Sequence, residues 1–416
     1  MSLVVHKYGG TSMGSIDRIK KVALRIVKWH NAGYQVVVVP SAMAGETNRL
    51  LKLAKDITIE PDNRELDMLA STGEQVSSAL LAIALQSAGV PARSYAGWQV
   101  PFRTNNAYTK ARIVSIDDQL IRSDLSSGKV VVITGFQGID PNGHITTLGR
   151  GGSDTSAVAV ASVLKADECL IYTDVDGVYT TDPRIVPEAC RMPVVSFEEM
   201  LEMASLGSKV LQIRSVEFAG KYRVPTRVLS SLTDPLLDLE EETRSGTLIT
   251  FEEDEKMEEA LVSGIAFSRD EAKVTLLSVP DQPGIAYSIL GPVAEANIDV
   301  DMIVQNQSVS GMTDFSFTVN RNEFQKVIEL LKNKVIPAVQ AKELATDQKV
   351  AKVSIVGIGM RSHVGVASLM FQALSNKGIN IQMISTSEIR TSVVIEDQYM
   401  ELAVRTLHHT FGLDQI

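Results

Sequence analysis

The chain has 416 residues, a length that is too great for one ordinary compact domain and that predicts two or three. Hydrophobic residues make up 44% of it and charged residues 22%, as in an average globular enzyme, which excludes disordered, collagen-like and coiled-coil proteins. The 40 lysines and arginines against 50 aspartates and glutamates give a formal net charge of -10, which repels nucleic acid and confines any anion site to a local feature.

The rest of the composition argues against secretion, membrane insertion and a metal site built from the chain's own side chains. Cys169 and Cys190 are too few for a disulfide framework and suit the reducing cytoplasm, where we expect the protein. The N-terminus has no signal-peptide pattern, and no apolar run approaches the roughly 18 residues of a membrane span. The six histidines are scattered without metal-ligand spacing, so we predict no metal ligands among them.

The first 230 residues alternate short apolar runs with amphipathic stretches. The apolar runs predict strands at residues 3–6, 35–40, 129–134 and 169–173. The amphipathic stretches predict helices at residues 16–31, 63–88 and 155–165. Buried strands separated by helices indicate an α/β domain with a mostly parallel sheet sandwiched by helices. Sheets of this type bind ligands at the carboxyl ends of their strands.

A glycine-rich motif, Lys7-Tyr8-Gly9-Gly10-Thr11-Ser12, follows the first predicted strand and precedes a helix that begins near Ser15. Paired glycines let backbone N–H groups approach phosphate oxygens, and Lys7 can reach a transferring phosphoryl group as a point charge. The motif lacks the spacing of a Walker A loop and of Gly-x-Gly-x-x-Gly. It predicts a phosphate cradle, and the alternative is a plain tight turn.

A second glycine-rich motif, Gly149-Arg150-Gly151-Gly152-Ser153-Asp154-Thr155, also precedes a predicted helix. Arg150 offers a two-pronged donor for a carboxylate, and Asp154 is suited to hold lysines in register. The alternative is that Asp154 or Thr155 only caps the helix while Arg150 is a surface side chain.

Two shorter segments carry further candidates. Ser41 follows the strand at 35–40, and Thr47 lies on the loop beyond it; Ser41 is either a turn residue or part of a site. Glu74 in Ser71-Thr72-Gly73-Glu74-Gln75 lies in an interrupted helix or accepts an ammonium group. Residues 172–184 superficially resemble an EF-hand loop, but the Asp-x-Asp-x-Asp-Gly register fails, so calcium is rejected there.

The second half of the chain contains an internal repeat. The periodic pattern gives way to Asp-Pro, Arg-Ser-Gly and a run of acids, which predicts a junction at residues 233–260. Beyond it, residues 284–286 match 365–367 and residues 299–303 match 380–384, both at an offset of 81. Each copy runs strand, glycine loop, helix, strand, strand, helix, which predicts two ferredoxin-like α+β modules. The alternative is two unrelated segments with chance similarity.

Taken together, these motifs resemble the aspartate kinases of the amino-acid kinase superfamily, in the form with a C-terminal pair of ACT domains. The resemblance spans the chain and is carried by residues 7–12, 71–74, 149–154, 172–178, 181–184 and 384–388. It implies a catalytic domain at 1–232, a junction at 233–260, and ACT domains at 261–345 and 346–416. Tyr8 and Met13 depart from the residues that many members have there, but neither position carries a charge that the chemistry needs.

The resemblance implies transfer of the ATP γ-phosphoryl group to the side-chain carboxylate of L-aspartate, which gives 4-phospho-L-aspartate and ADP. This is the first step of lysine, threonine and methionine biosynthesis. Mg²⁺ is expected to be held mainly by the nucleotide phosphates. Physical reasoning agrees, because a carboxylate is already a competent nucleophile near pH 7 and needs no general base. Catalysis then reduces to alignment and charge neutralisation.

The resemblance also assigns roles to the candidate residues. The expected catalytic residues are Lys7, Gly9, Gly10 and Asp154. The expected aspartate-binding residues are Ser41, Thr47, Glu74, Arg150, Gly151 and Ser153, with Arg150 on the α-carboxylate and Glu74 on the α-ammonium group. The expected nucleotide-binding residues are Lys7, Tyr8, Gly9, Gly10, Thr173, Asp174, Tyr179, Arg184 and Lys209.

In this family the ACT pair binds amino-acid end products, so lysine, threonine or both are the expected effectors. The loop before Gly284 carries Asp281, which can accept an ammonium group, or is only a tight turn. The second copy lacks that acid and has His363-Val364-Gly365 instead, which implies two unequal pockets. The expected effector contacts are Asp281, Asp299, Val300, Gln305, Asn380, Ile381, Thr386 and Glu388. ACT sandwiches usually pair through sheet edges, so a homodimer or larger oligomer is expected.

Two other functions compete with this one. A related kinase that acts on glutamate or acetylglutamate is opposed by Glu74 in its Ser-Thr-Gly-Glu motif and by the ACT pair. A nonenzymatic amino-acid sensor with an inactive kinase domain is opposed by intact Lys7, Glu74, Arg150 and Asp154.

Overall fold

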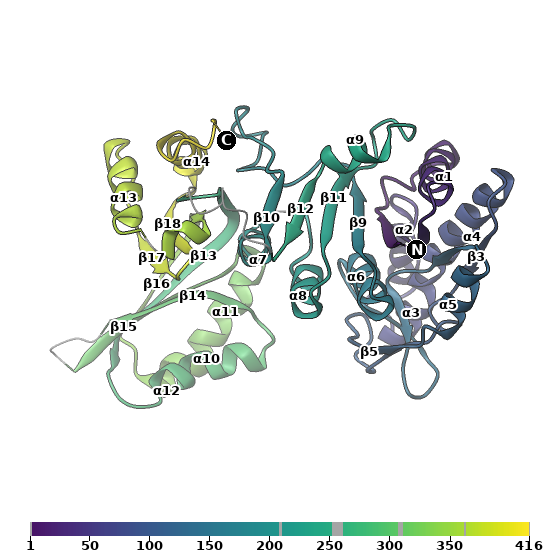
Figure 1. Ribbon diagram of the computed structural model, residues 1–416. Coiled ribbons are helices and arrows are strands. Elements are labelled where there is room, and N and C mark those ends of the chain that lie inside the picture. The colour runs from purple at the N-terminus through teal and green to yellow at the C-terminus, as the bar shows by residue number, and fades with distance from the viewer. Residues whose placement is uncertain (1, 208–209, 252–260, 307–310, 362, 416) are drawn as a thin grey trace. The chain divides into compact units, whose positions relative to one another are not determined.

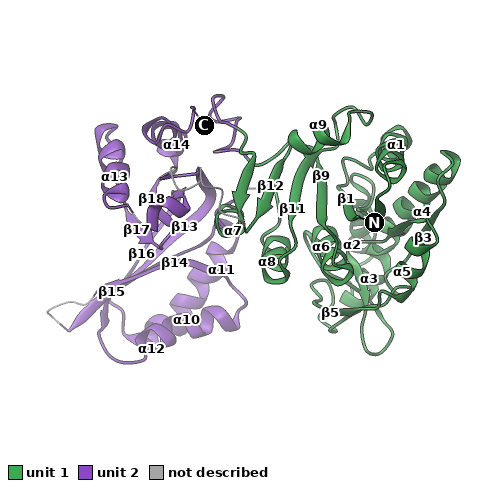
Figure 2. Ribbon diagram, viewed as in Figure 1, with its two compact units in different colours: residues 1–178, 191–204, 209–253 green, residues 179–190, 205–208, 254–416 purple. Residues whose placement is uncertain are grey.

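The computed structural model describes residues 2–207, 210–251, 261–306, 311–361 and 363–415. The chain forms two compact units (Figure 2). Unit 1 comprises residues 1–178, 191–204 and 209–253, and unit 2 comprises residues 179–190, 205–208 and 254–416. Part of the predicted junction, residues 252–260, lies outside the described residues.

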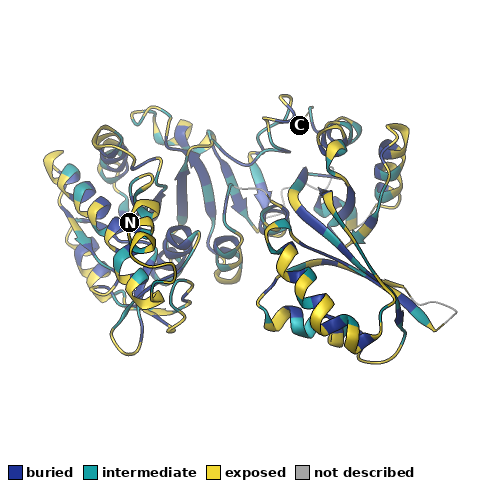
Figure 3. Ribbon diagram, turned by 180° about the vertical axis from the view of Figure 1, so that it is seen from behind, coloured by how far each residue is buried: buried dark blue, intermediate teal, exposed yellow. Residues whose placement is uncertain are grey.

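Unit 1 is built on an eight-stranded sheet in which only the β11–β12 pair is antiparallel. Its strands, in sheet order, are β10 (Val194–Ser196), β12 (Thr247–Thr250), β11 (Thr226–Ser230), β9 (Glu168–Thr173), β1 (Leu3–Tyr8), β2 (Gln35–Pro40), β6 (Val130–Ile133) and β3 (Ala92–Tyr95). The four predicted strands are confirmed as β1, β2, β6 and β9, which are neighbours in this sheet. Figure 1 shows β9 beside β11 and β12 of the same sheet. They are buried because helices cover both faces (Figure 3).

The helices of unit 1 are α1 (Ile16–Asn31), α2 (Glu46–Ile57), α3 (Asn63–Ala70), α4 (Thr72–Ser87), α5 (Gln119–Ser126), α6 (Gly152–Leu164), α7 (Phe197–Ser205), α8 (Ile213–Tyr222) and α9 (Leu239–Arg244). Helices α1 and α4 pack on the sheet face that carries Leu170 and Tyr172. Helices α6 and α8 pack on the opposite face, which carries Ile171. The prediction for α1 is confirmed to the residue, and the Ser15 side chain accepts a hydrogen bond from the backbone N–H of Arg18 at its N-terminus.

A small second sheet in unit 1 was not predicted. It contains β5 (Ile113–Ile116), β4 (Phe102–Thr104), β7 (Gln137–Ile139) and β8 (Ile145–Thr147), in that order. Strands of three or four residues are too short to show a hydrophobic period. The sheet matters for the site because β8 leads directly into the Gly149–Asp154 loop.

One helical stretch among the described residues bears on the expectation that the chain has no membrane span. The helical stretch Asn63–Ser87, formed by α3 and α4, is long and apolar enough to cross a membrane by length and composition. Half of its most apolar window is buried inside the protein, and Leu81 and Leu85 lie in the core beside α1. A core helix passes the same test, so the stretch is weak evidence for a membrane span.

Unit 2 contains one antiparallel six-stranded sheet. Its strands, in sheet order, are β14 (Val300–Asn306), β15 (Met312–Asn320), β13 (Gly264–Pro280), β16 (Glu343–Val356), β18 (Arg390–Glu396) and β17 (Met383–Thr386). Its helices are α10 (Ile285–Glu295), α11 (Phe324–Leu330), α12 (Ile336–Val339), α13 (Val366–Asn376) and α14 (Met400–Thr410), with single turns of 3₁₀ or π helix at Arg321–Glu323, Leu331–Val335, Ile358–Arg361 and Asp397–Tyr399.

The two ferredoxin-like modules of unit 2 share strands β13 and β16. The second half of β13 pairs with β15 and with the first half of β16, which completes the module containing α10. The first half of β13, residues 264–268, pairs with residues 352–356 of β16 and completes the module containing α13 and α14. The fourth strand of the second module therefore precedes the first module in the sequence. Each module keeps its own hydrophobic core.

A segment from the predicted catalytic part of the chain packs within unit 2. Ile185 and Val186 join the core of the module that contains α14. The Thr180 hydroxyl lies 2.9 Å from His408 Nε2, and the Arg405 guanidinium donates to the carbonyl oxygen of Ile185. Residues 179–190 are therefore structurally part of unit 2.

A buried cluster of ion pairs and hydrogen bonds connects α9 with α1 and with strand β9. The Glu242 side chain is 1% exposed and pairs with Arg25 at 2.5 Å and with Lys28 at 2.7 Å. It also accepts hydrogen bonds from the Trp29 indole N–H and the Tyr172 hydroxyl. Because two cations and two neutral donors converge on one carboxylate, its loss would leave buried Arg25 without a counter-charge.

We expect Glu242→Gln to lower the free energy of unfolding by about 3 kcal/mol, because the substitution keeps the shape but uncouples a buried cation. Glu240→Gln is the matched control, since Glu240 pairs with Arg244 on the surface of the same helix with 71% of its side chain exposed. That control should change the free energy by no more than about 0.5 kcal/mol. Urea unfolding of both variants makes the comparison, and equal losses would contradict the account.

Candidate active site

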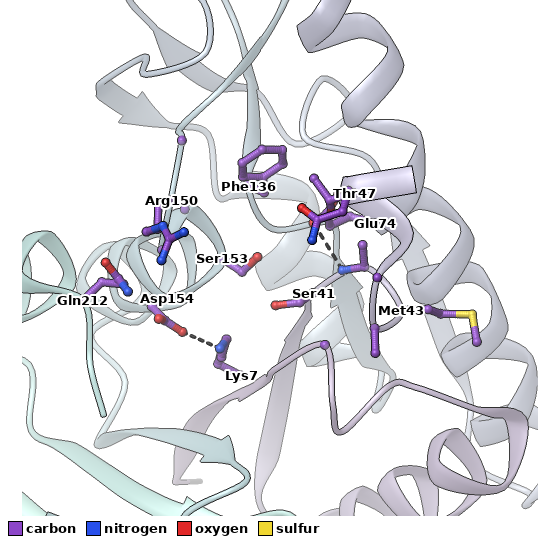
Figure 4. Close-up of a pocket in the computed structure, with 18 residues that line it drawn as sticks. Lys7, Ser41, Met43, Thr47, Glu74, Phe136, Arg150, Ser153, Asp154 and Gln212 are labelled. Atoms are coloured by element: carbon purple, nitrogen blue, oxygen red, sulfur yellow. Dashed lines mark hydrogen bonds and ion pairs between the residues drawn. The ribbon is translucent and has the colours of Figure 1, made fainter. Parts of the chain in front are cut away.

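A cavity of about 360 Å³ opens at the carboxyl ends of β1 and β2 (Figure 4). It is lined by Lys7, Gly10, Ser41, Ala42, Met43, Ala44, Gly45, Thr47, Asn48, Glu74, Phe136, Gly149, Arg150, Gly151, Gly152, Ser153, Asp154 and Gln212. The predicted catalytic and aspartate-binding residues all lie in this lining, except Gly9, which is next to it in sequence. Segments far apart in the sequence meet here because parallel strands place their carboxyl ends at one sheet edge.

The Lys7–Asp154 ion pair lies in the wall of the cavity. Lys7 Nζ is 2.5 Å from Asp154 Oδ1, and the two side chains are only 10% and 12% exposed. Lys7 comes from β1, and Asp154 from the first turn of α6, where a carboxylate also interacts favourably with the helix dipole. The pair therefore holds one ammonium group at a defined place, aimed along the cavity wall (Figure 4).

The helix-capping alternative for Asp154 and Thr155 is wrong. The N-cap residue of α6 is Gly151, whose backbone is left-handed with φ of +71°, and no side chain caps the helix. A Cβ atom at Gly151 would lie 2.2 Å from Gln212 Cγ, so the loop closes against α8 only with glycine there. Arg150 is exposed at the mouth of the cavity and forms no ion pair among the described residues.

The first glycine pair offers fewer free backbone N–H groups to a phosphate than we expected. The Gly9 N–H donates to the Tyr172 carbonyl oxygen at 3.2 Å and is therefore not available to a phosphate. Gly10 lines the cavity, and a Cβ atom there would lie 3.2 Å from the Ala42 carbonyl oxygen. The pair keeps the space beside Lys7 open, since a Cβ atom at Gly9 would lie 3.5 Å from Lys7 Nζ.

Glu74 is a buried carboxylate on the opposite wall. Helix α4 starts after an interruption at Ser71, and Glu74 lies in its first turn, 3% exposed. The segment is therefore an interrupted helix that places a carboxylate in the cavity lining, and the binding of an ammonium group there stays a prediction. Glu74 Oε1 accepts a hydrogen bond from the Ala42 N–H at 3.2 Å. Burial raises the pKa of Glu74 to about 7, although the Ala42 hydrogen bond acts in the opposite direction.

The predicted nucleotide-binding residues, unlike the aspartate-binding ones, belong to different parts of the structure. The Tyr8 side chain is fully buried, with its ring stacked on Tyr172 at 4.7 Å, so the expectation that it meets a nucleotide is wrong for the side chain. Thr173 is the last residue of β9, the neighbour of β1, and Asp174 follows it, so both lie at the same sheet edge as Gly10. Tyr179 and Arg184 belong to unit 2, where Arg184 pairs with Asp182 at 2.6 Å. Lys209 lies outside the described residues.

Nine lining residues were not among the predicted site residues: Ala42, Met43, Ala44, Gly45, Asn48, Phe136, Gly149, Gly152 and Gln212. Phe136 has a left-handed backbone with φ of +70°, and Gln212 is the N-cap residue of α8. Neither feature has a local sequence signal, because both side chains reach the cavity through tertiary packing. Among the described residues, no three His, Cys, Asp or Glu side chains are grouped closely enough to hold a metal ion.

The predicted effector residues lie in unit 2. Gly284 and Gly365 begin α10 and α13 with φ of +92° and +95°, as the repeat predicts. Asp281, on the loop before Gly284, donates its N–H to the Gly311 carbonyl oxygen at 2.9 Å. Gln305 lies near the end of β14, whereas Asp299 and Val300 lie at its start; Asn380 and Ile381 precede β17, Thr386 ends it, and Glu388 pairs with Arg361 at 3.2 Å. The residues thus lie at opposite ends of the strands and not around one point in either module.

Comparison with known proteins agrees with this architecture. A model of the amino acid kinase family matches residues 2–230, and models of the ACT domain match residues 273–335 and 353–411. The chain is 61% identical to an aspartate kinase of Pseudomonas putida, in a match that covers 100% of this chain and 98% of that protein.

Two solved structures of E. coli aspartokinase III share the fold. The complex with aspartate and ADP (R-state) has a TM-score of 0.78 at 26% identity, and the complex with lysine and aspartate (T-state) has a TM-score of 0.74 at 27% identity. Each match covers 98% of this chain and 99% of the other.

The fold and these matches define an amino acid kinase that is followed by two ACT domains, which confirms the predicted fold class. Within that class the chain belongs to the aspartate kinase family, and it is an ATP-dependent kinase.

The raised pKa of Glu74 predicts a pH dependence of stability. The unfolded chain releases this proton near the ordinary value of 4.5 and the folded protein only near 7, so the folded state holds the extra proton between those values. The free energy of unfolding should therefore fall as the pH rises through this window, by up to about 3 kcal/mol.

Urea unfolding of the wild type and of Glu74→Gln at about pH 5 and about pH 8 isolates this contribution. We expect the Gln variant to gain stability relative to the wild type at the higher pH. A difference between the two proteins that does not change with pH would show that Glu74 titrates normally.

Proposed function

We propose that the enzyme transfers the γ-phosphoryl group of ATP to the side-chain carboxylate of L-aspartate, giving 4-phospho-L-aspartate and ADP. The observation that carries this proposal is the nearly buried Lys7–Asp154 pair, which fixes an ammonium group in a cavity whose other walls hold Arg150 and Glu74. A relative of this chain binds aspartate and ADP.

The charges of the cavity are complementary to a free amino acid. Arg150, exposed at the mouth and without an ion pair among the described residues, provides the donor for the α-carboxylate. Glu74, when ionised, accepts the α-ammonium group on the other wall. Ser41, Thr47 and Ser153 add hydroxyl groups, and Gly151 lets the loop approach the substrate. With both α-groups held, the side-chain carboxylate is directed toward Lys7.

The chemical step needs no proton transfer from the acceptor. A carboxylate oxygen of aspartate forms a bond to the γ-phosphorus as the bond between that phosphorus and the β,γ-bridging oxygen breaks, and ADP leaves with the electron pair. Lys7, with Gly9 and Gly10 leaving room beside it, stabilises charge on the transferring oxygens. Asp154 keeps the Lys7 ammonium group in line.

We place the nucleotide beside Gly10, along the edge that carries Thr173 and Asp174. Contacts from Tyr179, Arg184 and Lys209 stay predictions from the sequence. Mg²⁺, when bound with ATP, supplies charge neutralisation on the β- and γ-phosphates and is held mainly by those phosphates. The cavity suits this division, because the described residues bring no three His, Cys, Asp or Glu side chains close enough together to hold the ion by themselves.

We further propose that lysine, threonine or both inhibit the enzyme by binding to the ACT modules of unit 2, with Asp281 and Gln305, which lie at one end of β13 and β14, as contacts in the first module. A relative has been solved in complex with lysine and aspartate, which supports lysine as one effector. The enzyme would work as a homodimer or larger oligomer in the cytoplasm, at the first step of lysine, threonine and methionine biosynthesis. The two free cysteines, one of them buried, suit a reducing compartment.

Trapping of the product tests the reaction. Incubation with ATP, Mg²⁺, L-aspartate and hydroxylamine should give aspartyl hydroxamate, and lysine or threonine, alone or together, should reduce its rate of formation. Product with glutamate but not aspartate would overturn the substrate assignment. Amino-acid binding without any product would favour the sensor function instead.

Replacement of Lys7 tests the catalytic role. We expect Lys7→Ala to lower kcat at least 100-fold, since removal of one preorganised charge donor costs about 3 kcal/mol in the transition state. Lys129→Ala is the matched control, because Lys129 pairs with Asp124 at 2.7 Å in the same unit but outside the cavity. Steady-state kinetics of both folded variants decide the matter, and near-normal turnover by Lys7→Ala would contradict the mechanism.

A further inference from the structure

Asp67 is a buried carboxylate outside the active-site cavity that holds the loop carrying Arg150. It lies on α3, is 1% exposed, and takes part in no ion pair among the described residues. The backbone N–H of Thr109 donates to both Asp67 oxygens at 3.0 Å. The backbone N–H of Thr147 donates at 2.8 Å and its hydroxyl at 2.6 Å. One carboxylate therefore binds two separate backbone segments.

Both segments adjoin the loop that carries Arg150. Thr147 ends β8, three residues before Arg150. Thr109 has a left-handed backbone with φ of +67°, a conformation that a β-branched residue adopts only when its surroundings impose it. Its carbonyl oxygen packs against Gly149, where a Cβ atom would approach it to 2.8 Å. The two hydrogen bonds from the Thr109 N–H to Asp67 hold this contact in place.

A positively charged side chain also binds these two segments, through hydrogen bonds separate from those of Asp67. Arg214 on α8 donates through Nη1 to the Leu148 carbonyl oxygen at 2.7 Å and through Nη2 to the Ala111 carbonyl oxygen at 2.8 Å. The segment at 109–111 and the segment at 147–148 are thus each bound by one acid and one base. Charged partners form stronger hydrogen bonds to backbone groups than neutral ones do. The geometry of the Arg150 loop is therefore set by Asp67 and Arg214, neither of which lines the cavity.

We propose that Asp67 is a positioning residue for aspartate binding, which acts by fixing the loop that presents Arg150 to the α-carboxylate of the substrate. The inference rests on the proposed function, since it assigns Arg150 to that carboxylate. Asp67 itself touches neither substrate nor reacting atoms. Its loss affects the affinity for aspartate, while Lys7 and the nucleotide edge keep their arrangement.

Asp67→Asn tests the proposal, because the amide nitrogen replaces one acceptor and opposes the N–H donors of Thr109 and Thr147. We expect the KM for aspartate to rise about tenfold, as for loss of one hydrogen bond to a charged group. The kcat and the KM for ATP should stay within about twofold of the wild type.

The matched control is Asp124→Asn. Asp124 is also buried in unit 1 and accepts hydrogen bonds from the Tyr95 hydroxyl at 2.6 Å and from Lys129 at 2.7 Å, but it does not line the cavity. This variant should lower the melting temperature without changing the KM for aspartate. If Asp67→Asn does not fold, Thr147→Val removes a single donor to Asp67 and should raise the KM about two- to threefold.

Arg150→Ala and the double variant with Asp67→Asn separate this inference from the proposed function. If Asp67 acts through Arg150, the double variant should have the same KM for aspartate as Arg150→Ala alone. An unchanged KM for aspartate in Arg150→Ala would overturn the assigned role of Arg150. It would also overturn the inference that Asp67 acts through Arg150. Two results would overturn the role of Asp67 and leave that of Arg150 intact. In the first, the KM for aspartate rises in Arg150→Ala but stays unchanged in Asp67→Asn and Thr147→Val. In the second, the effects of Arg150→Ala and Asp67→Asn on this KM are fully additive in the double variant.

Discussion

The active site depends on one constraint, the placement of a nearly buried ammonium group by a nearly buried carboxylate. Taking Lys7 or Asp154 out of water alone would be costly, so each requires the other, and their 2.5 Å contact fixes the end of β1 against the first turn of α6. The two parallel neighbours of β1 then bring Ser41 and Thr173 to the same edge of the sheet. Because the chain as a whole is negatively charged, this local cation is what makes the cavity suitable for a phosphoryl group.

The remaining features of the cavity follow from the chemistry of its proposed substrate. An amino acid carries a fixed positive and a fixed negative group, and the cavity offers Glu74 and Arg150 on different walls to receive them. The burial that raises the pKa of Glu74 also strengthens its interaction with an ammonium group, since a low dielectric favours paired charges. In the proposed mechanism, orientation of the substrate and charge neutralisation by Lys7 and the nucleotide-bound metal act on a nucleophile that needs no deprotonation.

The sequence predicted those parts of the protein whose structure is determined locally. The four central strands are apolar on both faces, and Ser15 marks the start of α1, so both were visible as patterns. Lys7, Arg150 and Asp154 were candidates because charged side chains stand beside glycines before predicted helices, and Glu74 because of its Ser-Thr-Gly-Glu motif; their roles came from the family resemblance. The two ferredoxin-like modules share strands β13 and β16 because these two strands pair with each other. No local pattern in the sequence shows that pairing. The contributions of Phe136, Gln212 and Asp67 likewise depend on residues tens of positions away in the sequence.

The central claim is that a single cavity orients aspartate by its α-groups and presents its side chain to Lys7. The most direct measurement is a crystal structure of the full chain with L-aspartate and a non-hydrolysable ATP analogue. The account predicts the α-carboxylate on Arg150, the α-ammonium group on Glu74, and the side-chain carboxylate between Lys7 and the γ-phosphate. Aspartate bound in the reverse orientation, with its side chain on Arg150, or bound outside this cavity would contradict it.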